Sequence, residues 1–340
     1  MFLGKRKIFV IAEIGHNHMG SIKEAFKLFE HAKRCGADAV KLQKRDNVSL
    51  YTKEFYNSPY INPNSYGPTY GKHREYLEFG FKEYKKLKKF AKKLGIIFFA
   101  TPFDFQSIKF LKKLNMPLYK IASGDLTNIP LQIEIAKTKK PIILSTGGGT
   151  FDDIDRAVKN ILKINKKLKI LHCTASYPAK LEDMNLRVIE KLKNKYKSLT
   201  IGLSDHENGI DAGVVAYMLG ARVFEKHFTL NRSNKGTDHA FSLEPLGLEK
   251  FIRNLKRIDI LLGSSNKRFL KSEKGPIFKM RKSIVANKKL SKGTKINFDD
   301  LSFKSPGKGI EPYNYLKIIG KVLKKNLKED DLIFFKDLRK

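Results

Sequence analysis

The stretch that decides the fold is the apolar run IFVIAEIG, residues 8–15, which is followed at once by the polar residue His16. Seven similar runs follow, and nearly all of them end on a polar or charged residue. The eight runs span residues 8–15, 39–43, 96–102, 118–123, 141–146, 168–174, 199–205 and 222–227. Short apolar runs that alternate with amphipathic segments are typical of buried parallel strands. Eight such strand–helix units predict a closed (β/α)8 barrel of the TIM type.

The segments between the runs carry hydrophobic residues at helical spacing, which predicts helices around the barrel. The expected helices span residues 21–35, 82–94, 104–114, 129–137, 151–164, 186–196, 209–219 and 248–262. The connection 45–79 is unusually long and contains six tyrosines. Its aromatic content argues against disorder, so we expect a folded loop over the barrel mouth.

The pattern changes in the last part of the chain, where short strand candidates alternate with turn signals. These candidates span residues 283–286, 294–297, 301–304 and 331–335. We therefore predict a barrel domain over residues 1–270, a linker over residues 271–280 and a small, mostly β domain over residues 281–340.

The composition limits the partners that the chain is expected to have. The formal net charge is +34, but the excess is mostly lysine on predicted helix faces, without a nucleic-acid-binding motif. No apolar run approaches the roughly 20 residues that span a bilayer, and no signal-like segment precedes the first strand. Cys35 and Cys173 are too few for a disulfide framework, so we expect both to be reduced. These features predict a cytoplasmic protein with no nucleic-acid and no membrane partner.

Polar residues at the predicted strand ends are the candidate site, because catalytic residues of such barrels lie at that face. They are Glu13, His16, Lys41, Gln43, Lys120, Ser123, Ser145, Tyr177, Asp205, His206, Glu225 and His227. His206 and His227 end consecutive strands, and they either share one divalent cation or are held by hydrogen bonds.

Two further groups of strand-end residues allow two interpretations each. Lys41 and Lys120 either cradle a phosphate, together with neighbouring serine hydroxyls, or pair with carboxylates. Glu13 and Glu225 either act as general bases or form salt bridges with neighbouring lysines.

These residues lie in motifs that resemble those of sialic acid synthases. The opening AEIGHNHMG, residues 12–20, resembles the A-E-I-G-x-N-H-x-G opening of that family. The matches continue at residues 40–43, 120–125, 144–147, 172–178, 202–206, 225–229, 236–239 and 242–245. The tail from residue 281 to residue 310 is similar to the antifreeze-like (SAF) domain of the same family.

The resemblance implies a condensation of phosphoenolpyruvate with N-acetylmannosamine or its 6-phosphate, giving N-acetylneuraminate or its 9-phosphate and inorganic phosphate. It implies a divalent metal on His206 and His227, with Mn²⁺ first and Mg²⁺ or Co²⁺ as alternatives. It assigns phosphoenolpyruvate to Lys41, Lys120, Ser123, Ser145 and Ser204. It places Gln43, Asp125, Tyr177 and Asp238 beside the sugar, and gives proton transfer and the handling of water to Glu13 and Glu225.

The resemblance also implies a domain-swapped homodimer in which the SAF domain caps the partner's barrel. Two departures concern the substrates: Ala175 replaces a common asparagine, and Ser305 replaces an arginine that reaches the sugar. In the long loop, Lys72, His73 and Arg74 are candidates to meet a second phosphate. The acceptor therefore stays open, and the alternatives are a legionaminic- or pseudaminic-type synthase or another phosphoenolpyruvate-dependent aldol enzyme.

Overall fold

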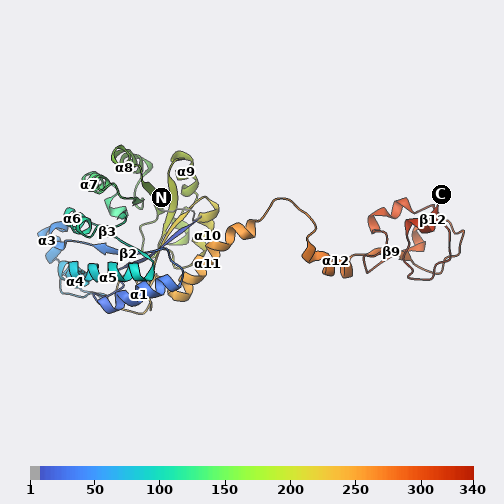
Figure 1. The fold of residues 1–340 in the computed structure, drawn as a ribbon, viewed down its shortest axis with the longest axis horizontal. Coiled ribbons are helices and arrows are strands. Elements are labelled where there is room, and N and C mark those ends of the chain that lie inside the picture. The colour runs from blue at the N-terminus through green and yellow to red at the C-terminus, as the bar shows by residue number, and fades with distance from the viewer. Residues whose placement is uncertain (1–7) are drawn as a thin grey trace. The chain divides into compact units, whose positions relative to one another are not determined.

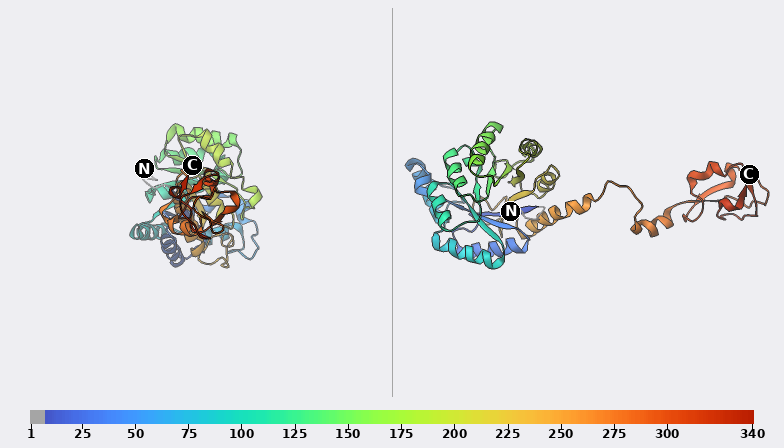
Figure 2. Two further views of the ribbon diagram at one scale, coloured as in Figure 1. Left: turned by 90° about the vertical axis from the view of Figure 1, so that its right-hand side faces the viewer. Right: turned by 45° about the horizontal axis from the view of Figure 1, so that its top comes forward.

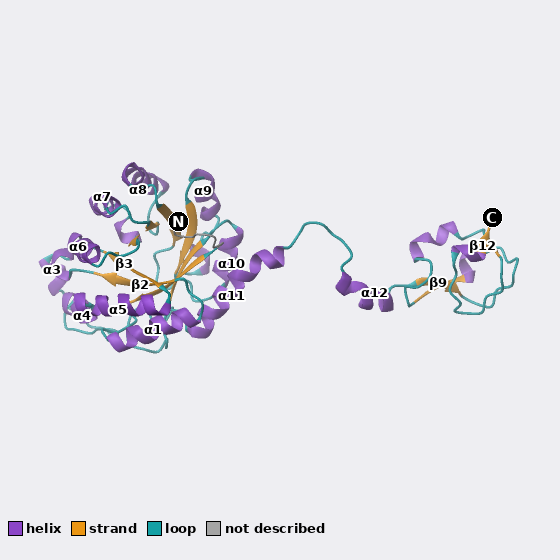
Figure 3. Ribbon diagram, in the orientation of Figure 1, coloured by secondary structure: helices purple, strands orange, loops and turns teal. Residues whose placement is uncertain are grey.

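The computed structural model describes residues 8–340, which form two compact units that divide between Leu262 and Gly263. In the first unit, eight parallel strands close into a barrel in chain order, and helices form the layer outside them (Figures 1 and 3). The strands are β1 (Phe9–Gly15), β2 (Ala39–Lys44), β3 (Ile97–Pro102), β4 (Tyr119–Ile121), β5 (Ile142–Ser145), β6 (Leu168–Cys173), β7 (Thr200–Asp205) and β8 (Val223–His227). The prediction of a TIM-type barrel is confirmed.

The helices that surround the strands in Figure 2 begin at most three residues, and end at most one residue, from the predicted bounds. They are α1 (Ile22–Arg34), α5 (Phe81–Leu94), α6 (Phe105–Lys113), α7 (Ile129–Lys137), α8 (Phe151–Ile164), α9 (Val188–Lys195), α10 (Asp211–Met218) and α11 (Pro245–Leu262). Side-chain caps fix several of the starts: the Ser21 hydroxyl accepts from the Glu24 N–H, and Thr150 forms a capping box with Asp153.

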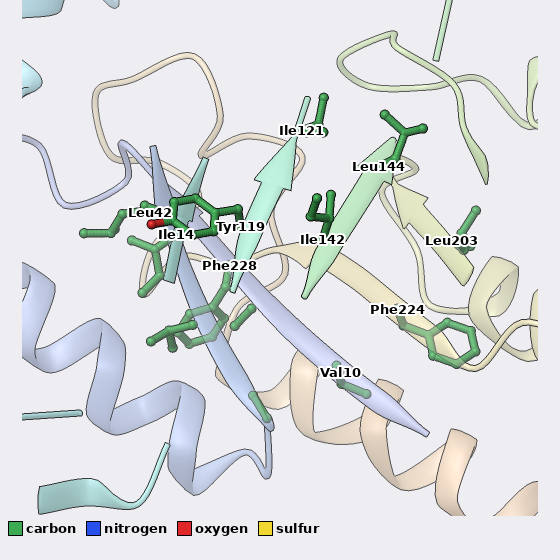
Figure 4. Close-up of a cluster of buried hydrophobic side chains, with 14 of the residues drawn as sticks. Val10, Ile14, Leu42, Tyr119, Ile121, Ile142, Leu144, Leu203, Phe224 and Phe228 are labelled. Atoms are coloured by element: carbon green, nitrogen blue, oxygen red, sulfur yellow. The ribbon is translucent and has the colours of Figure 1, made fainter. Parts of the chain in front are cut away.

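Two apolar layers hold the barrel together. The larger layer lies between the strands and the helices and includes Val10, Ile121, Leu144 and Phe224 (Figure 4). A smaller cluster is formed by alternate strand residues and comprises Phe9, Ile11, Ala39, Phe99, Leu118, Ile143, Leu171 and Val223. Because strand side chains alternate between two faces, the residue two positions after each of these lies on the same face.

That alternation positions the site. Two residues beyond Ile11 is Glu13, and two beyond Ala39 is Lys41. The same step leads from the other members of the smaller cluster to Thr101, Lys120, Ser145, Cys173 and Glu225. Seven of the strands therefore place a polar residue next to the apolar cluster, on the side where the strands end.

The long connection after β2 is folded, as predicted. It contains the short helices α2 (Asn47–Leu50), α3 (Lys53–Asn57) and α4 (Tyr70–Leu77). Its aromatic rings pack on one another, with Tyr70 in contact with the rings of Tyr51, Phe55 and Tyr60. These contacts give the connection a small core of its own.

The second unit contains two antiparallel two-stranded sheets, β9 (Ser283–Ala286) with β10 (Leu301–Lys304), and β11 (Val322–Leu323) with β12 (Leu338–Arg339). Its core is aliphatic and includes Ile284, Ile318 and Ile333. The expected strands β9 and β10 are confirmed, and the two-residue strands β11 and β12 were not predicted.

Two predicted strands of this unit were wrong. Residues 294–297 and 331–335 each make only one isolated bridge, at Lys295 and Leu332, because turns interrupt the ladder on either side. The segment predicted as a linker, residues 271–280, holds a 3-10 turn (Lys271–Glu273) and helix α12 (Lys274–Met280). Within residues 8–340, no helix is both long enough and apolar enough to cross a membrane.

Candidate active site

A cavity of about 660 Å³ opens where the barrel strands end. It is lined by Glu13, Lys41, Gln43, Arg45, Asn64, Arg74, Thr101, Phe103, Lys120, Ala122, Ser123, Gly124, Ser145, Cys173, Ala175, Tyr177, Ser204, His206, Glu225, His227, Thr237 and Asp238. All of the barrel strands contribute to this lining, which is the arrangement that active sites of TIM barrels have.

Two lysines and two glutamates form a buried ionic network in this cavity. Lys41 Nζ lies 2.8 Å from Glu13 Oε2 and 3.7 Å from Glu225 Oε1, and Lys120 Nζ lies 3.1 Å from the same Glu225 oxygen. Both interpretations of the lysines therefore hold in part, since the lysines pair with carboxylates and still line the cavity. The network therefore brings two amines and two carboxyl groups together in the cavity.

The two glutamates differ in their pKa values. Burial raises the pKa of Glu225, but the charges of Lys120 and Lys41 outweigh burial and bring that pKa down to about 2. For Glu13, burial outweighs the charge of Lys41, and the pKa lies above its ordinary value. Two carboxylates whose pKa values are pushed apart are typical of sites that move protons.

Three serine hydroxyls line the same cavity as the two lysines. Ser123 Oγ accepts a hydrogen bond from the Gly147 N–H at 3.0 Å, and Ser204 Oγ donates to Glu225 Oε1 at 3.2 Å. Ser145 Oγ is buried and has no hydrogen-bond partner among the described residues. An unsatisfied buried hydroxyl in the same cavity as two ammonium groups fits the oxygens of an anionic substrate.

His206 and His227 lie side by side at the ends of β7 and β8, with ring centroids 5.3 Å apart. His206 Nδ1 lies 2.8 Å from the Thr174 carbonyl oxygen, so Nδ1 carries the proton and Nε2 presents a lone pair. Burial, followed by the charge of His227, lowers the pKa of His206 to about 3, and burial lowers the pKa of His227 to about 4. Both rings are therefore neutral at pH 7.

These histidines fit the predicted metal. Neutral imidazoles are the form that binds divalent transition metals, and a second hydrogen bond that orients the ring, as at His206, is typical of ligands. His227 Nδ1 is buried and has no hydrogen-bond partner, although Asp238 Oδ2 lies 3.6 Å away. Within residues 8–340, no group of three or more His, Cys, Asp or Glu side chains is arranged for a metal. The remaining ligands would therefore be water and substrate oxygens.

Beyond the ionic network, hydrogen bonds continue toward the long connection. Gln43 Nε2 donates to Glu13 Oε1 at 2.8 Å, and Arg45 Nη2 donates to Gln43 Oε1 at 2.7 Å. His16 follows, with its Nε2 3.3 Å from Arg45 Nη1 and its Nδ1 3.4 Å from Arg74 Nη1. Burial and the charges of the two arginines hold the pKa of His16 well below its ordinary value.

Three predicted site residues lie outside the cavity lining. Asp125 Oδ1 accepts from Asn128 Nδ2 at 3.0 Å, below the turn that follows β4. Asp205 is paired with Lys226 at 2.7 Å, because alternation turns both of these residues away from Ser204 and Glu225. His16 does not line the cavity but contacts Arg45 and Arg74, which do. Apart from the loop candidates Lys72 and His73, every other predicted site residue lines the cavity.

Sequence reasoning missed several lining residues. Thr101 lies on the inward face of β3, and its hydroxyl accepts a hydrogen bond from Lys41 Nζ at 3.0 Å. The alternation of residues along β3 could have identified it. Arg45 lies two residues after Gln43 and stacks on Phe103, with its guanidinium carbon 3.9 Å from the ring centroid. Of the three loop residues expected near a phosphate, only Arg74 lines the cavity. Lys72 is exposed and pairs with Glu75.

Comparison with known proteins supplies the family. The NeuB family model matches residues 28–267, and the SAF domain model matches residues 281–339. The chain belongs to the NeuB family.

Members of the NeuB family with assigned names share about a third of their residues with this chain. N-acetylneuraminate-9-phosphate synthase of Mus musculus is 38% identical over 97% of this chain and 92% of its own length. N,N'-diacetyllegionaminic acid synthase of Campylobacter jejuni is also 38% identical, over 96% of this chain and 99% of its own. The N-acetylneuraminic acid synthetase of Leptospira borgpetersenii, solved with citrate, is 34% identical with a TM-score of 0.68, over 80% of this chain and 90% of that one. The chain is therefore a sialic acid synthase-type protein of the NeuB family.

Proposed function

We propose that this NeuB-family protein condenses phosphoenolpyruvate with an N-acylated aminosugar, N-acetylmannosamine or its 6-phosphate. The product is N-acetylneuraminate or its 9-phosphate. The observation that carries the proposal is the layer of two lysines and three serine hydroxyls beside two neutral histidines in one cavity. The names of the relatives support the same reaction class.

The proposed chemistry balances with one water molecule. C3 of phosphoenolpyruvate forms a bond to the aldehyde carbon of the acceptor, and the aldehyde oxygen takes up a proton. Water adds to C2 and loses a proton, and the bond between C2 and the bridging oxygen breaks. Inorganic phosphate then leaves with the bridging oxygen and takes up the second proton of the water, which the C2 hydroxyl releases as it becomes the keto group of the product.

The residues have separate tasks in this reaction. We assign the phosphate to Lys41, Lys120 and the hydroxyls of Ser123, Ser145 and Ser204, because positive charge and hydroxyl donors offset its negative charge. We assign the acceptor to Gln43, Tyr177 and Asp238, which line the cavity around the histidines.

The two glutamates are proposed to handle protons. Glu225 is ionised at neutral pH because its pKa is about 2, and its Oε2 is buried without a hydrogen-bond partner among the described residues. That oxygen is placed to accept a hydrogen bond from the attacking water. Glu13, with its raised pKa, is the better proton donor of the two. A divalent cation, Mn²⁺ first, would be held by His206 and His227 and would supply Lewis-acid stabilisation of the aldehyde oxygen when bound.

Phosphate release tests the reaction. The purified protein with Mn²⁺ should release phosphate from phosphoenolpyruvate only when an acceptor is present, and mass spectrometry should find the nine-carbon acid. Phosphoenolpyruvate labelled with ¹⁸O in the bridging position should yield labelled phosphate. Unlabelled phosphate would refute the proposed C–O cleavage, and no acceptor-dependent release would refute the function.

A second candidate is a legionaminic-type synthase, because the Campylobacter jejuni relative of that name is as similar as the mouse protein. A 2,4-diacetamido acceptor belongs in the same assay for this reason. Preferential turnover of that acceptor would select the second candidate and leave the cleavage chemistry unchanged.

A further inference from the structure

Two arginines form a cationic group in the cavity that is separate from the two lysines. Arg45 follows β2, and Arg74 belongs to α4 of the long connection. Both line the cavity, and His16 lies between them, with a ring nitrogen 3.3 Å from Arg45 and 3.4 Å from Arg74. Because that imidazole is neutral, it separates the two charges without offsetting either.

Neither guanidinium has a carboxylate within ion-pair distance among the described residues. Glu78, the carboxylate that acts on Arg45, is paired with Lys44 at 2.8 Å and lies 3.5 Å from His16 Nε2. Asp238 lies beside His227 at 3.6 Å, beyond ion-pair distance from Arg74. Inside the cavity, Asp238 is the carboxylate that acts on Arg74, so two guanidinium charges share one carboxylate at this end, whereas two glutamates accompany the two lysines. A buried charge without a partner is costly, which points to an anion that arrives with the ligand.

Contacts with neighbouring side chains hold both guanidinium groups in place and leave some of their N–H donors unused. Stacking on Phe103 and the bond to Gln43 fix the plane of Arg45, and Tyr70 Oη accepts from both Nε and Nη2 of Arg74 at 3.2 and 2.9 Å. A guanidinium has five N–H donors. The bond to Gln43 uses one donor of Arg45, the bonds to Tyr70 use two donors of Arg74, and the single acceptor nitrogen of neutral His16 can take one more from either arginine. Two fixed forks with spare donors suit a group with several oxygens, as a phosphate ester has.

We propose that Arg45 and Arg74 bind a phosphate ester carried by the aminosugar acceptor, so that this protein selects a phosphorylated acceptor. This inference rests on the proposed function for the identity of the reaction. The arginines are linked to the lysine network through Gln43 and Glu13, so the two anions of the reaction would occupy opposite ends of one hydrogen-bonded chain.

The test compares two acceptors in the same variant. We expect the unaltered protein to have a higher kcat/KM for N-acetylmannosamine 6-phosphate than for N-acetylmannosamine. Arg74→Gln and Arg45→Gln should each lower that ratio at least about tenfold, the size of one lost charge-assisted interaction. Arg74→Lys should retain part of the preference, because the charge remains. Lys72→Gln, in the same helix but exposed and paired with Glu75, is the matched control and should leave the ratio unchanged.

The comparison within one variant separates this role from a folding defect, which would lower both acceptors alike. An unaltered preference in both arginine variants would overturn the proposal. A raised KM for phosphoenolpyruvate with an unaltered preference would also overturn it, because the arginines would then hold the other substrate.

Calorimetry keeps the inference testable if the reaction itself fails. Mannose 6-phosphate and mannose are titrated into the full chain without phosphoenolpyruvate. Binding of the phosphate ester alone, weakened in Arg74→Gln but not in Lys72→Gln, would support the arginine site even without turnover. Equal binding of both sugars, or no effect of Arg74→Gln, would refute it.

Discussion

Lys120→Met is the substitution that tests the lysine end of the cavity most directly. Lys120 is 3% exposed, and its Nζ lies 3.1 Å from Glu225 Oε1. Methionine keeps most of the volume and removes the charge. Glu225 still has Lys41 at 3.7 Å and Ser204 at 3.2 Å, so the carboxylate is not left without partners.

The size of the effect follows from those contacts. A hydrogen bond to a charged group contributes about 1.5–3 kcal/mol, so kcat/KM for phosphoenolpyruvate should fall by about 10- to 150-fold. Complete isolation of a buried charge costs about 3–5 kcal/mol in folding. Because Glu225 keeps two partners, we expect a loss of about 1–3 kcal/mol in the free energy of unfolding.

The pH dependence of stability should change in the same variant. With a folded pKa of about 2 against an ordinary 4.5, ionised Glu225 stabilises the fold above pH 4.5, and this contribution is lost as the pH falls towards 2. Lys120 makes the largest contribution that lowers this pKa, so its removal should raise the pKa of Glu225. The loss of stability on acidification should then begin at a higher pH in the variant than in the unaltered protein.

Steady-state kinetics with varied phosphoenolpyruvate, and urea unfolding at pH 7 and pH 4, measure both effects. Lys89→Met is the control, because Lys89 is an exposed lysine of α5. If Lys120→Met had the same kcat/KM as Lys89→Met, the phosphate would not be bound where we place it.

Four further results are expected. His227→Ala should retain less Mn²⁺ by elemental analysis and lose turnover, and full activity after verified removal of all metal would contradict a metal-dependent site. Gly202→Ala should lower the free energy of unfolding by about 1–3 kcal/mol, because an added Cβ would lie 2.1 Å from the Val223 carbonyl oxygen; an unchanged melting temperature would contradict that close approach. Lys226→Met breaks the buried pair with Asp205 and should cost about 3–5 kcal/mol in unfolding while leaving the KM for phosphoenolpyruvate unchanged. We also propose that the chain is a homodimer, and a fully active monomer in sedimentation experiments would refute this.

The barrel and most of its polar layer could be predicted because their signals are local. Each apolar run ends within a residue or two of its strand, and alternation carries the inward face from Ile11 to Glu13 and from Ala39 to Lys41. Asp205 was placed in the site because it ends a strand, but the same alternation turns it away toward Lys226. A prediction that also considered which face of the strand each residue occupies would have excluded Asp205 from the candidate site.

The arginine end of the cavity could not be predicted in the same way. Arg45 and Arg74 come together through the fold of the long connection, and nothing in their local sequence shows that Lys72 faces away while Arg74 faces inward. The two-residue strands β11 and β12 were missed because their pairing depends on contacts between distant turns.

The long connection has a consequence for how such a protein can change its substrate. Its aromatic rings pack on one another, and backbone bonds such as Tyr70 N–H to the Ser58 carbonyl, 3.0 Å, close it on itself. It is joined to the barrel at β2 and α5, so its interior can vary without disturbing the strands that carry the lysines and histidines. Grafting this segment from one relative onto another is therefore a route to exchange acceptors while the bond-forming machinery stays intact.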